Sequence, residues 1–341
     1  MPSNPVIIIS RTDSIGDVVL TLPMAGIIRH FLPGSRIIFL GRDYTRDVIA
    51  LSEHVDQFIS YDDLLKLPAD EQVKALIALQ ATHIVHVFPV KAIAQLAKKA
   101  NIPNRIGTTN RLWHWFTCNI RVKLSRKNSA LHEAQLNTKL LSPLGIQKHF
   151  DLEEINQAYG FTRIPQLETP FEQLLTPGKM RVILHPKSKG SAREWGLANF
   201  SKLIELLNPE HYTVYISGTA QEGELVKPLL EKHPQAMDLT GKLSLKQFIA
   251  FIDHCDALVA ASTGPLHIAA ALGKKAIGLF SPMRPIHPGR WMPIGPQAYP
   301  LVFNADCEQC KAKKHCDCIT RIKPEEVVKL LERKRHDTGA E

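Results

Sequence analysis

The chain has 341 residues, of which 44% are hydrophobic and 22% are charged, and its formal net charge at pH 7 is +9. This length accommodates two domains, and this composition is that of a soluble globular protein. No apolar stretch approaches the ~20 residues of a membrane span, and no basic region of a signal peptide precedes the first apolar run, so we expect a cytoplasmic protein. The charge suits a polyanionic partner but does not choose among nucleic acid, anionic lipid and a phosphorylated glycan.

The first half of the chain alternates short apolar runs with helical patterns, which predicts a parallel sheet. It opens with a strand over 6–9 and a polar loop that contains Gly16 and Asp17. The other predicted elements are helices over 18–31, 47–51, 69–79, 92–100 and 132–144 and strands over 36–40, 57–60, 83–88 and 104–107. Asp17 stands at the start of a helix, where the helix dipole favours a carboxylate, so helix capping explains it on local grounds.

A basic segment with interleaved aromatic residues lies at 98–127. It contains eight Lys or Arg residues and no Asp or Glu, with Trp113, Trp115 and Phe116 near its middle. We interpret it as a loop that offers a surface to an anionic partner or to a bilayer interface. A solvated basic loop with a tucked aromatic anchor explains the same residues, and both interpretations remain open.

A second alternation of strands and helices follows a proline-containing stretch at 151–179, which marks the expected linker. The elements predicted after it are strands over 181–184 and 212–217 and helices over 198–207 and 245–252. The polar loop at 185–195 carries three cations, Lys187, Lys189 and Arg193. We therefore expect two separate α/β sheets, each of which begins with a strand and a polar loop.

The segment 257–280 predicts a strand, a tight turn, a short helix and a second strand. Apolar runs at 257–261 and 276–280 indicate buried strands, and 266–272 is rich in Ala and Leu. This order is half of a nucleotide-binding βαβ layout, in which the turn and the helix N-terminus receive a phosphate. An ordinary connection with a capped helix has the same pattern, and the spacing alone does not decide between them.

Four residues of this turn and of the helix after it suit a phosphate. Thr263 can cap the helix, and Gly264 lets a ligand approach the backbone closely. Pro265 suits the first helical turn, where a missing N–H costs nothing. His267 lies on the same turn, within reach of the same anion.

Four of the six cysteines lie within twelve residues, as Cys307, Cys310, Cys316 and Cys318. In a reducing compartment they form either a metal knuckle or four thiols on a loop. The last pair is closer than the usual zinc spacing, so we assign no metal ligand here. A final amphipathic helix is predicted over 324–334, and the tail after it is expected to be disordered.

Several motifs together resemble glycosyltransferase family 9, the lipopolysaccharide heptosyltransferases, over nearly the whole length. They are SIGDVVLTLP near the front, HPKSKGSAREWGLANFSKLIELL in the middle, and STGPLHIAAALGKKAIGLF followed by RPIHPGRW. The resemblance implies the glycosyltransferase B fold, α/β with two Rossmann-like doubly wound domains that face a central cleft. It implies an acceptor domain over 1–170, a nucleotide-sugar domain over 178–322, a last helix over 323–335 that returns to the first domain, and a disordered tail over 336–341.

The resemblance also implies an activity: inverting, metal-independent transfer of a heptose from ADP-L-glycero-D-manno-heptose to the lipopolysaccharide inner core, by a protein peripheral to the inner membrane. No cofactor is implied beyond the ADP-sugar co-substrate, and no nucleic acid is implied as a partner. By position, Asp17 matches the general base and Arg193 the group that holds the diphosphate. The implied donor-binding residues are Ser188, Lys189, Glu222, Leu243, Ser262, Thr263, Gly264, Pro265 and His267. The acceptor surface is expected to include Arg105, Arg111, Arg121 and Lys123.

One departure from the family pattern bears on the sugar. Well-known heptosyltransferases carry an Asp that contacts the heptose where this chain has Ser262, so another nucleotide-activated sugar is the alternative substrate. A nucleotide-sugar epimerase or hydrolase on the same fold would leave the basic aromatic segment without a role. A zinc-containing nucleic-acid binder would use the cysteines, but the basic residues lie far from them in sequence.

Overall fold

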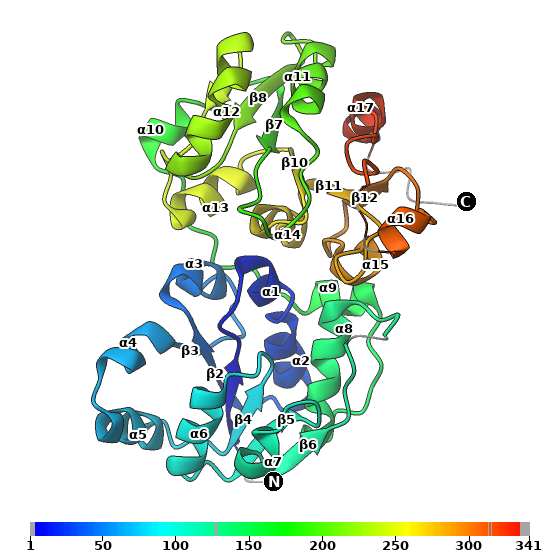
Figure 1. Ribbon diagram of the computed structural model, residues 1–341. Helices are drawn as coiled ribbons and strands as arrows, with labels where there is room; N and C mark the ends of the chain where they lie inside the picture. The colour runs from blue at the N-terminus through cyan, green and yellow to red at the C-terminus, as the bar shows by residue number, and fades with distance from the viewer. Residues whose placement is uncertain (1–3, 127–128, 313, 315, 335–341) are drawn as a thin grey trace. The chain divides into compact units, whose positions relative to one another are not determined.

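The computed structural model describes residues 4–126, 129–312, 314 and 316–334 (Figure 1). The chain divides into two compact units, Met1–Arg163 and Ile164–Glu341. The division falls earlier than the boundary expected between 170 and 178. The expected disordered tail over 336–341 lies outside the described residues. None of the helices in the described ranges combines the length and the apolar character that a membrane span requires.

The first unit is built on a six-stranded parallel sheet in the order β3-β2-β1-β4-β5-β6 (Figure 1). Its strands are β1 (Val6–Ser10), β2 (Arg36–Gly41), β3 (Gln57–Ser60), β4 (His83–His86), β5 (Asn104–Thr108) and β6 (Ile120–Val122). The central strand β1 pairs with β2 and β4, and Ile7, Ile8 and Ile9 are at most 1% exposed. A central parallel strand is covered on both faces, which is why its sequence is a continuous apolar run.

The helices of the first unit follow its strands in alternation. They are α1 (Ile15–Val19), α2 (Pro23–Phe31), α3 (Arg46–Ile49), α4 (Tyr61–Lys66), α5 (Ala69–Ala78), α6 (Lys91–Lys99), α7 (His114–Thr117), α8 (Glu133–Thr138) and α9 (Leu152–Gln157), with 3-10 turns η1 (Asp43–Thr45) and η2 (Lys139–Leu144). The prediction of one helix over 18–31 is wrong, because the chain forms α1 and α2 there. Pro23 has no N–H to donate to the carbonyl of Val19, so a new helix begins at Pro23.

The basic segment 98–127 is not the loop that we expected. The strands β5 and β6 pair in parallel within it, and α7 connects them. The strand β6 lies at the edge of the sheet and has only three residues, which explains why no alternating pattern marked it. The expected linker over 151–179 likewise contains α9 and a short helix of the second unit, α10.

The second unit holds another six-stranded parallel sheet, in the order β12-β11-β10-β7-β8-β9 (Figure 1). Its strands are β7 (Met180–His185), β8 (Tyr212–Ile216), β9 (Met237–Asp238), β10 (Ala257–Ala261), β11 (Lys275–Phe280) and β12 (Ala298–Val302). Its helices are α10 (Thr169–Glu172), α11 (Leu197–Leu206), α12 (Ala220–Lys232), α13 (Leu245–Asp253), α14 (Gly264–Ala271), α15 (Pro288–Trp291), α16 (Glu308–Lys311) and α17 (Pro324–Glu332). The predicted α/β class and the predicted order of strand, turn, helix and strand over 257–280 are confirmed.

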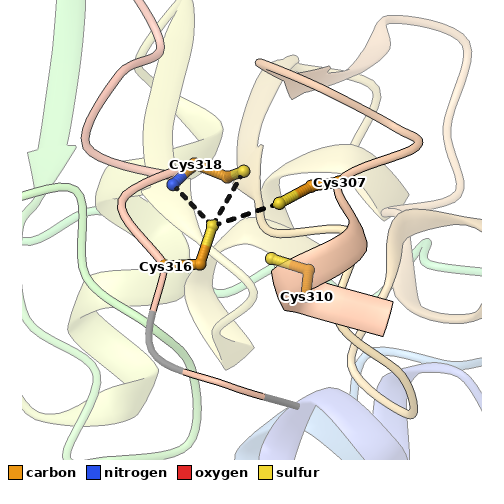
Figure 2. A group of neighbouring side chains, drawn as sticks. All are labelled: Cys307, Cys310, Cys316 and Cys318. Atoms are coloured by element: carbon orange, nitrogen blue, oxygen red, sulfur yellow. Dashed lines mark hydrogen bonds between the residues drawn. The ribbon is translucent and has the colours of Figure 1, made fainter. Parts of the chain in front are cut away.

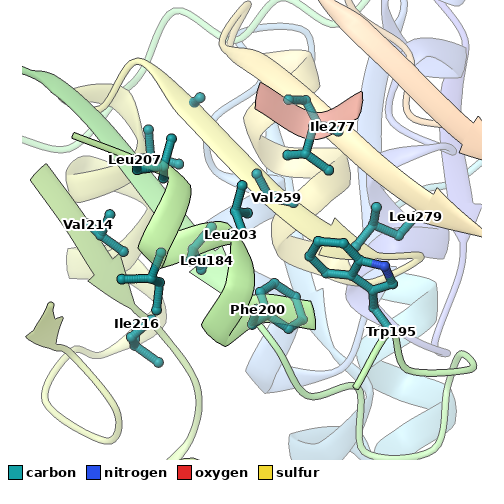
Figure 3. Close-up of a cluster of buried hydrophobic side chains, with 14 of the residues drawn as sticks. Leu184, Trp195, Phe200, Leu203, Leu207, Val214, Ile216, Val259, Ile277 and Leu279 are labelled. Carbon is teal, nitrogen blue, oxygen red and sulfur yellow. The ribbon is translucent and has the colours of Figure 1, made fainter. Parts of the chain in front are cut away.

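The core of the second unit lies between its sheet and α11 (Figure 3). Trp195 is 1% exposed, and its ring meets that of Phe200 edge-on, with the ring centroids 4.9 Å apart. The labelled side chains of β7, β8, β10 and β11 reach the same cluster from the sheet (Figure 3). Tryptophan thus closes the core at the point where the loop after β7 enters α11.

The last helix, α17, belongs to this same core, which corrects the expectation that it returns to the first domain. Its buried residues Val327 and Leu331 pack in the cluster that contains Trp195. The indole N–H of Trp195 donates to the carbonyl of Ile322 at 2.9 Å, just ahead of the helix. Lys275 on β11 is buried and donates through Nζ to the carbonyls at the C-terminal end of α17, where a cation is favoured by the dipole.

Replacing Trp195 by Ala should lower the free energy of unfolding by ~3–5 kcal/mol, because it removes a fully buried aromatic side chain and leaves a cavity. Urea denaturation followed by circular dichroism measures the change. Trp115→Ala is the matched control, because Trp115 is 54% exposed, and we expect it to cost less than ~1 kcal/mol. Equal shifts for the two variants would contradict the central place of Trp195 in the core.

Candidate functional site

The turn between β10 and α14 has the geometry of a helix start without its usual side-chain cap. Thr263 occupies the N-cap position, but its side chain makes no capping hydrogen bond, so the prediction that it caps the helix is wrong. The residue is 6% exposed, and among the described residues its Oγ1 has no hydrogen-bond partner. Buried hydroxyls are normally hydrogen-bonded, so this atom is suited to bind a polar ligand at the turn.

The other residues predicted for this turn lie on the elements expected for them. Ser262 follows β10, and Gly264 and Pro265 begin α14. His267 lies on the first turn of the helix and is 2% exposed. The positive end of the helix dipole and the buried hydroxyl of Thr263 thus occupy one turn, which favours an anion there.

Arg193 is the charged residue that lines a small pocket beside this turn in the second unit. It lines that pocket together with Ser262, Ser281 and apolar side chains. Its guanidinium donates to two backbone carbonyls, that of Cys316 at 3.0 Å and that of Lys314 at 3.2 Å. Among the described residues no carboxylate pairs with Arg193, so carbonyl oxygens orient the charge without neutralising it.

The remainder of the loop after β7 is largely occupied with its own contacts. Lys187 forms an ion pair with Glu194, and Ser188, which is 6% exposed, donates to the carbonyl of Ala192 at 2.9 Å. Lys189 is exposed and has a left-handed backbone, with φ of 48°. Of the three cations in the loop, Arg193 is therefore the one held toward the pocket.

Glu222 and Leu243 lie farther along the same sheet edge, after β8 and ahead of α13. Glu222 is 6% exposed and completes a capping box, in which its carboxylate accepts from the N–H of Thr219 at 2.8 Å. Capping is thus its observed role, and contact with a ribose stays a prediction. Leu243 is half-buried beside the N-cap of α13. Burial lowers the pKa of nearby His185 to about 4, although the charge of Glu222 opposes the shift, so this ring is neutral at pH 7.

Asp17 lies in the first unit, on α1, and shares a buried arginine with two other acids. Arg11 is 3% exposed and pairs with Asp17, with Asp13 at 2.6 Å and with Glu133 at 3.4 Å. Asp17 also accepts a hydrogen bond from the hydroxyl of Ser14. Its side chain remains 17% exposed, so this carboxylate is fixed in orientation but open to solvent.

Asp13 is a member of this group that the sequence analysis did not single out. Burial raises the pKa of Asp13 to about 6; the charge of Arg11 opposes the rise and that of Asp17 adds to it. The Asp-x-x-x-Asp spacing gave no signal, because only the fold shows that both carboxylates meet one arginine. Asp13 is therefore a second candidate for proton transfer in this unit.

The four predicted acceptor residues divide into two kinds. Arg105 is half-buried and donates to backbone carbonyls of Ile102 and Thr117, so it supports the local fold. The other three, Arg111, Arg121 and Lys123, are exposed. They accompany three exposed apolar side chains of the segment before β6, which are Leu112 at 74%, Trp115 at 54% and Phe116 at 69%.

Cation–π contacts join basic residues of this surface to its tryptophans. The guanidinium of Arg121 lies 4.6 Å from the ring centroid of Trp115, and that of Arg111 lies 5.6 Å from the ring of Trp113. Trp113 is half-buried, whereas Trp115 is exposed. Both interpretations of the basic segment therefore have a matching residue: Trp113 is the tucked anchor, and Trp115 belongs to the exposed surface.

The sequence profile of glycosyltransferase family 9 (heptosyltransferase) matches residues 74–319, well over half of the chain. The chain belongs to glycosyltransferase family 9. The predicted family is confirmed, and with it the prediction that the protein is an enzyme of the glycosyltransferase class.

Relatives of this family 9 glycosyltransferase cover most of its length. A putative glycosyltransferase of Haemophilus influenzae is 26% identical over 306 residues, which are 84% of this chain and 86% of the relative. The solved family 9 glycosyltransferase of Veillonella parvula aligns with a TM-score of 0.76 at 20% identity, over 96% of this chain and 98% of its own. Escherichia coli heptosyltransferase WaaC with ADP aligns with a TM-score of 0.72 at 17% identity, over 96% and 99%. The expected glycosyltransferase B fold is confirmed.

The raised pKa of Asp13 should make the free energy of unfolding depend on pH in a predictable direction. Its folded-state pKa of about 6 lies above the ordinary 3.8, so its contribution is present below pH ~4 and is lost as the pH rises to ~6. Asn cannot titrate. The free energy of unfolding of Asp13→Asn relative to wild type should therefore increase between pH ~4 and ~7, by at most ~3 kcal/mol.

Urea denaturation at several pH values measures this difference. The control is Asp238→Asn: burial raises the pKa of Asp238, but hydrogen bonds from Thr240 hold it below its usual value overall. Its contribution is already complete at pH 5, so this variant should give a flat difference between pH ~5 and ~7. A flat difference for Asp13→Asn as well would show that Asp13 is ionised throughout.

Proposed function

We propose that this glycosyltransferase moves a heptose from ADP-L-glycero-D-manno-heptose to the inner core of lipopolysaccharide, with inversion at the anomeric carbon and with no metal ion in the reaction. The family supports the sugar, and the presence of ADP with a relative of the same fold supports the nucleotide. One observation in this chain carries the donor assignment, namely that Arg193 and Ser262 line the same pocket. No described carboxylate neutralises Arg193, and Ser262 lies at the start of the turn before α14.

In this proposal the second unit binds the donor diphosphate. The dipole and N–H groups at the start of α14 attract the phosphates, and the buried hydroxyl of Thr263 donates to them. Arg193 offers a fixed cation for the charge that grows on the departing ADP. Interactions that strengthen as this charge develops lower the barrier, and no metal ion is needed for them.

The first unit supplies the base for the acceptor. A sugar hydroxyl has a pKa far above 7 and must lose its proton as it attacks the anomeric carbon. Asp17 is the proposed base, held by Arg11 and Ser14 and still accessible. The hydroxyl oxygen forms the bond to the anomeric carbon from the side opposite the diphosphate, its proton passes to Asp17, and ADP leaves with the bonding electrons.

The surface formed by Arg111, Arg121, Lys123 and the exposed aromatic residues Trp115 and Phe116 is the proposed meeting place with the anionic lipid acceptor. Basic residues attract phosphate groups, and aromatic side chains favour the interface between water and lipid. This arrangement would hold a cytoplasmic enzyme at the inner face of the membrane, and we propose no nucleic acid as a partner.

A second candidate is transfer of another nucleotide-activated sugar. It is favoured by Ser262, which lines the donor pocket where well-known heptosyltransferases carry an Asp that contacts the heptose. The nucleotide assignment does not depend on this residue, because Arg193 and the α14 turn contact phosphate in either case.

The deciding experiment compares candidate donors on the purified full chain. ADP-heptose should raise the melting temperature more than UDP- or GDP-sugars do, and it should label heptose-deficient lipopolysaccharide. If a different ADP-sugar gives the larger shift and the product, the second candidate holds. If no nucleotide sugar raises the melting temperature, the donor assignment is wrong.

Asp17→Asn should reduce transfer by at least a thousandfold and change donor affinity by less than threefold, because the amide retains the shape but cannot accept the proton. Asp13→Asn is the comparison, since it also removes one acid from Arg11. If the loss of an ion pair explained the effect, the two variants would be equally impaired. Transfer by Asp17→Asn within tenfold of wild type would reject this base, and a deeper loss in Asp13→Asn would give the role to Asp13.

Arg193→Ala should weaken both ADP binding and kcat, since the diphosphate is charged in the ground state and gains charge in the transition state. We expect about tenfold or more in each. Isothermal titration with ADP and initial rates measure the two effects. Lys202→Ala serves as the control in the same unit, because that side chain is exposed and lies on α11, outside this loop. Unchanged ADP affinity in Arg193→Ala would instead point to Lys187 or Lys189 as the phosphate ligand.

Neutralising Arg111, Arg121 and Lys123 together to Gln should raise the acceptor KM on the order of a hundredfold, at about 1 kcal/mol for each basic residue near an anionic surface. Donor affinity should not change, and the effect should shrink at high salt because of screening. The control neutralises three other exposed lysines of the first unit, namely Lys66, Lys74 and Lys148. Equal KM values for the two triple variants would show that the acceptor docks elsewhere.

A further inference from the structure

Four cysteine sulfurs converge in the segment between β12 and α17 (Figure 2). Cys307 is the N-cap of α16 and Cys310 lies on its single turn, while Cys316 and Cys318 lie on the chain that returns from it. We call these four residues the cysteine cluster. Figure 2 shows their side chains directed toward one another. All four Sγ atoms lie within 4.8 Å of one another, so residues up to eleven positions apart form one compact group.

The distances within the cluster are those of separate thiols rather than of disulfides. All four cysteines are free. The Sγ of Cys316 lies 3.0 Å from that of Cys318 and 3.4 Å from that of Cys307. A disulfide requires ~2.05 Å. Thiols are weak hydrogen-bonding groups, so contacts among them give little reason for four to converge.

The dimensions fit one metal ion at the centre. With metal–sulfur distances of ~2.3 Å, the sulfurs of a regular tetrahedron lie ~3.8 Å apart, which is within the range that the cluster spans. A four-iron cluster places each cysteine on a different iron and separates the sulfurs more widely. Cys310 and Cys318 are buried, at 0% and 5% exposure, while the other two are half-buried, so an ion can enter and is then shielded.

We propose that Cys307, Cys310, Cys316 and Cys318 bind one divalent metal ion, zinc or ferrous iron, as four thiolates. A tetrahedral site of four sulfur ligands selects these two metals. Binding takes the metal from solution and releases the four thiol protons to the buffer. Because all coordination positions are filled by protein, the ion has no place for substrate, and it stabilises the fold without entering the transfer reaction.

The cluster is connected directly to the candidate donor pocket. The two carbonyls that hold Arg193 belong to Cys316 and to Lys314, two positions before it. The Sγ of Cys310 also lies 3.3 Å from the hydroxyl of Ser281, which lines the pocket with Arg193. A metal ion would therefore fix the backbone that positions the Arg193 guanidinium, and this second step rests on the proposed function.

The test begins with the metal content of the full chain, purified without chelator and without a metal-affinity tag. Plasma mass spectrometry should find about one equivalent of zinc or iron in wild type. Ferric iron bound to thiolates is coloured and zinc is not, so air oxidation followed by an absorption spectrum distinguishes the two. The double variant Cys316→Ser/Cys318→Ser should hold less than a tenth of an equivalent.

Cys255→Ser is the matched control, because Cys255 is a buried cysteine of the same unit outside the cluster, and it should retain about one equivalent. Should the double variant fail to fold, wild type stripped by a chelator and reloaded with Co²⁺ gives the second readout. Four-thiolate cobalt should produce sulfur-to-cobalt absorption bands. Wild type that holds less than a tenth of an equivalent and shows no such bands would overturn the proposal, as would equal metal contents in wild type and the double variant.

ADP titration separates the two inferences. Loss of the metal should weaken ADP binding about as much as Arg193→Ala does, that is, about tenfold or more. Metal loss with unchanged ADP affinity would overturn the link to Arg193 while the metal site stands. If wild type holds the metal but binds no ADP, the proposed function fails and the metal site remains.

Discussion

The parallel direction of all strands is the constraint on which the arrangement of the molecule depends. Central strands such as β1 and β10 are buried on both faces, so they are almost entirely apolar, and polar side chains gather in the loops at their carboxyl ends. In the first unit the loop after β1 carries Arg11 and Asp13. In the second, the loops after β7, β10 and β11 bring Arg193, Ser262 and Ser281 to one pocket. In each sheet the candidate functional residues therefore lie at the carboxyl ends of the strands.

The two units use arginine in opposite ways at these edges. Arg11 is buried among three carboxylates, so its charge is neutralised and its effect is to hold the acids in place. Arg193 is oriented by carbonyl oxygens, which carry only partial charges, and its positive charge remains available for an anion. The first arrangement suits proton transfer, and the second suits a diphosphate. The proposed assignment of the donor to the second unit and of the acceptor to the first rests on this electrostatic difference.

The sequence predicted the central elements well, because burial on both faces leaves a continuous apolar run, as in β1 and in the β10–α14–β11 unit. It missed the edge strands β6, β9 and β12, which are only partly buried and carry no such run. It also joined α1 to α2, since the apolar periodicity continues through Pro23 although the hydrogen bonds do not. Local pattern thus predicted the interior of each sheet better than its margins.

Residue types and motifs in the sequence pointed to many residues of the candidate site but not to the contacts between them. Arg193 was identified, whereas its hold on the carbonyl of Cys316 joins residues more than a hundred positions apart. The shared use of Arg11 by Asp13 and Glu133 is equally non-local. The cysteine spacing argued against a regular zinc motif, yet the fold brings the four sulfurs together. Such convergence depends on tertiary structure, which spacing along the chain does not encode.

The attachment of α17 to the second core has a consequence for how the chain matures during synthesis. The strands and helices of the first unit are all in place once about 160 residues have been made, so that unit can fold while the ribosome is still translating. The second core lacks Val327 and Leu331 until the last helix emerges, and Lys275 on β11 has no carbonyls at the end of that helix to bind until then. Until then the nascent second sheet lacks part of the cluster that surrounds Trp195, and a chaperone would have most to protect at this stage.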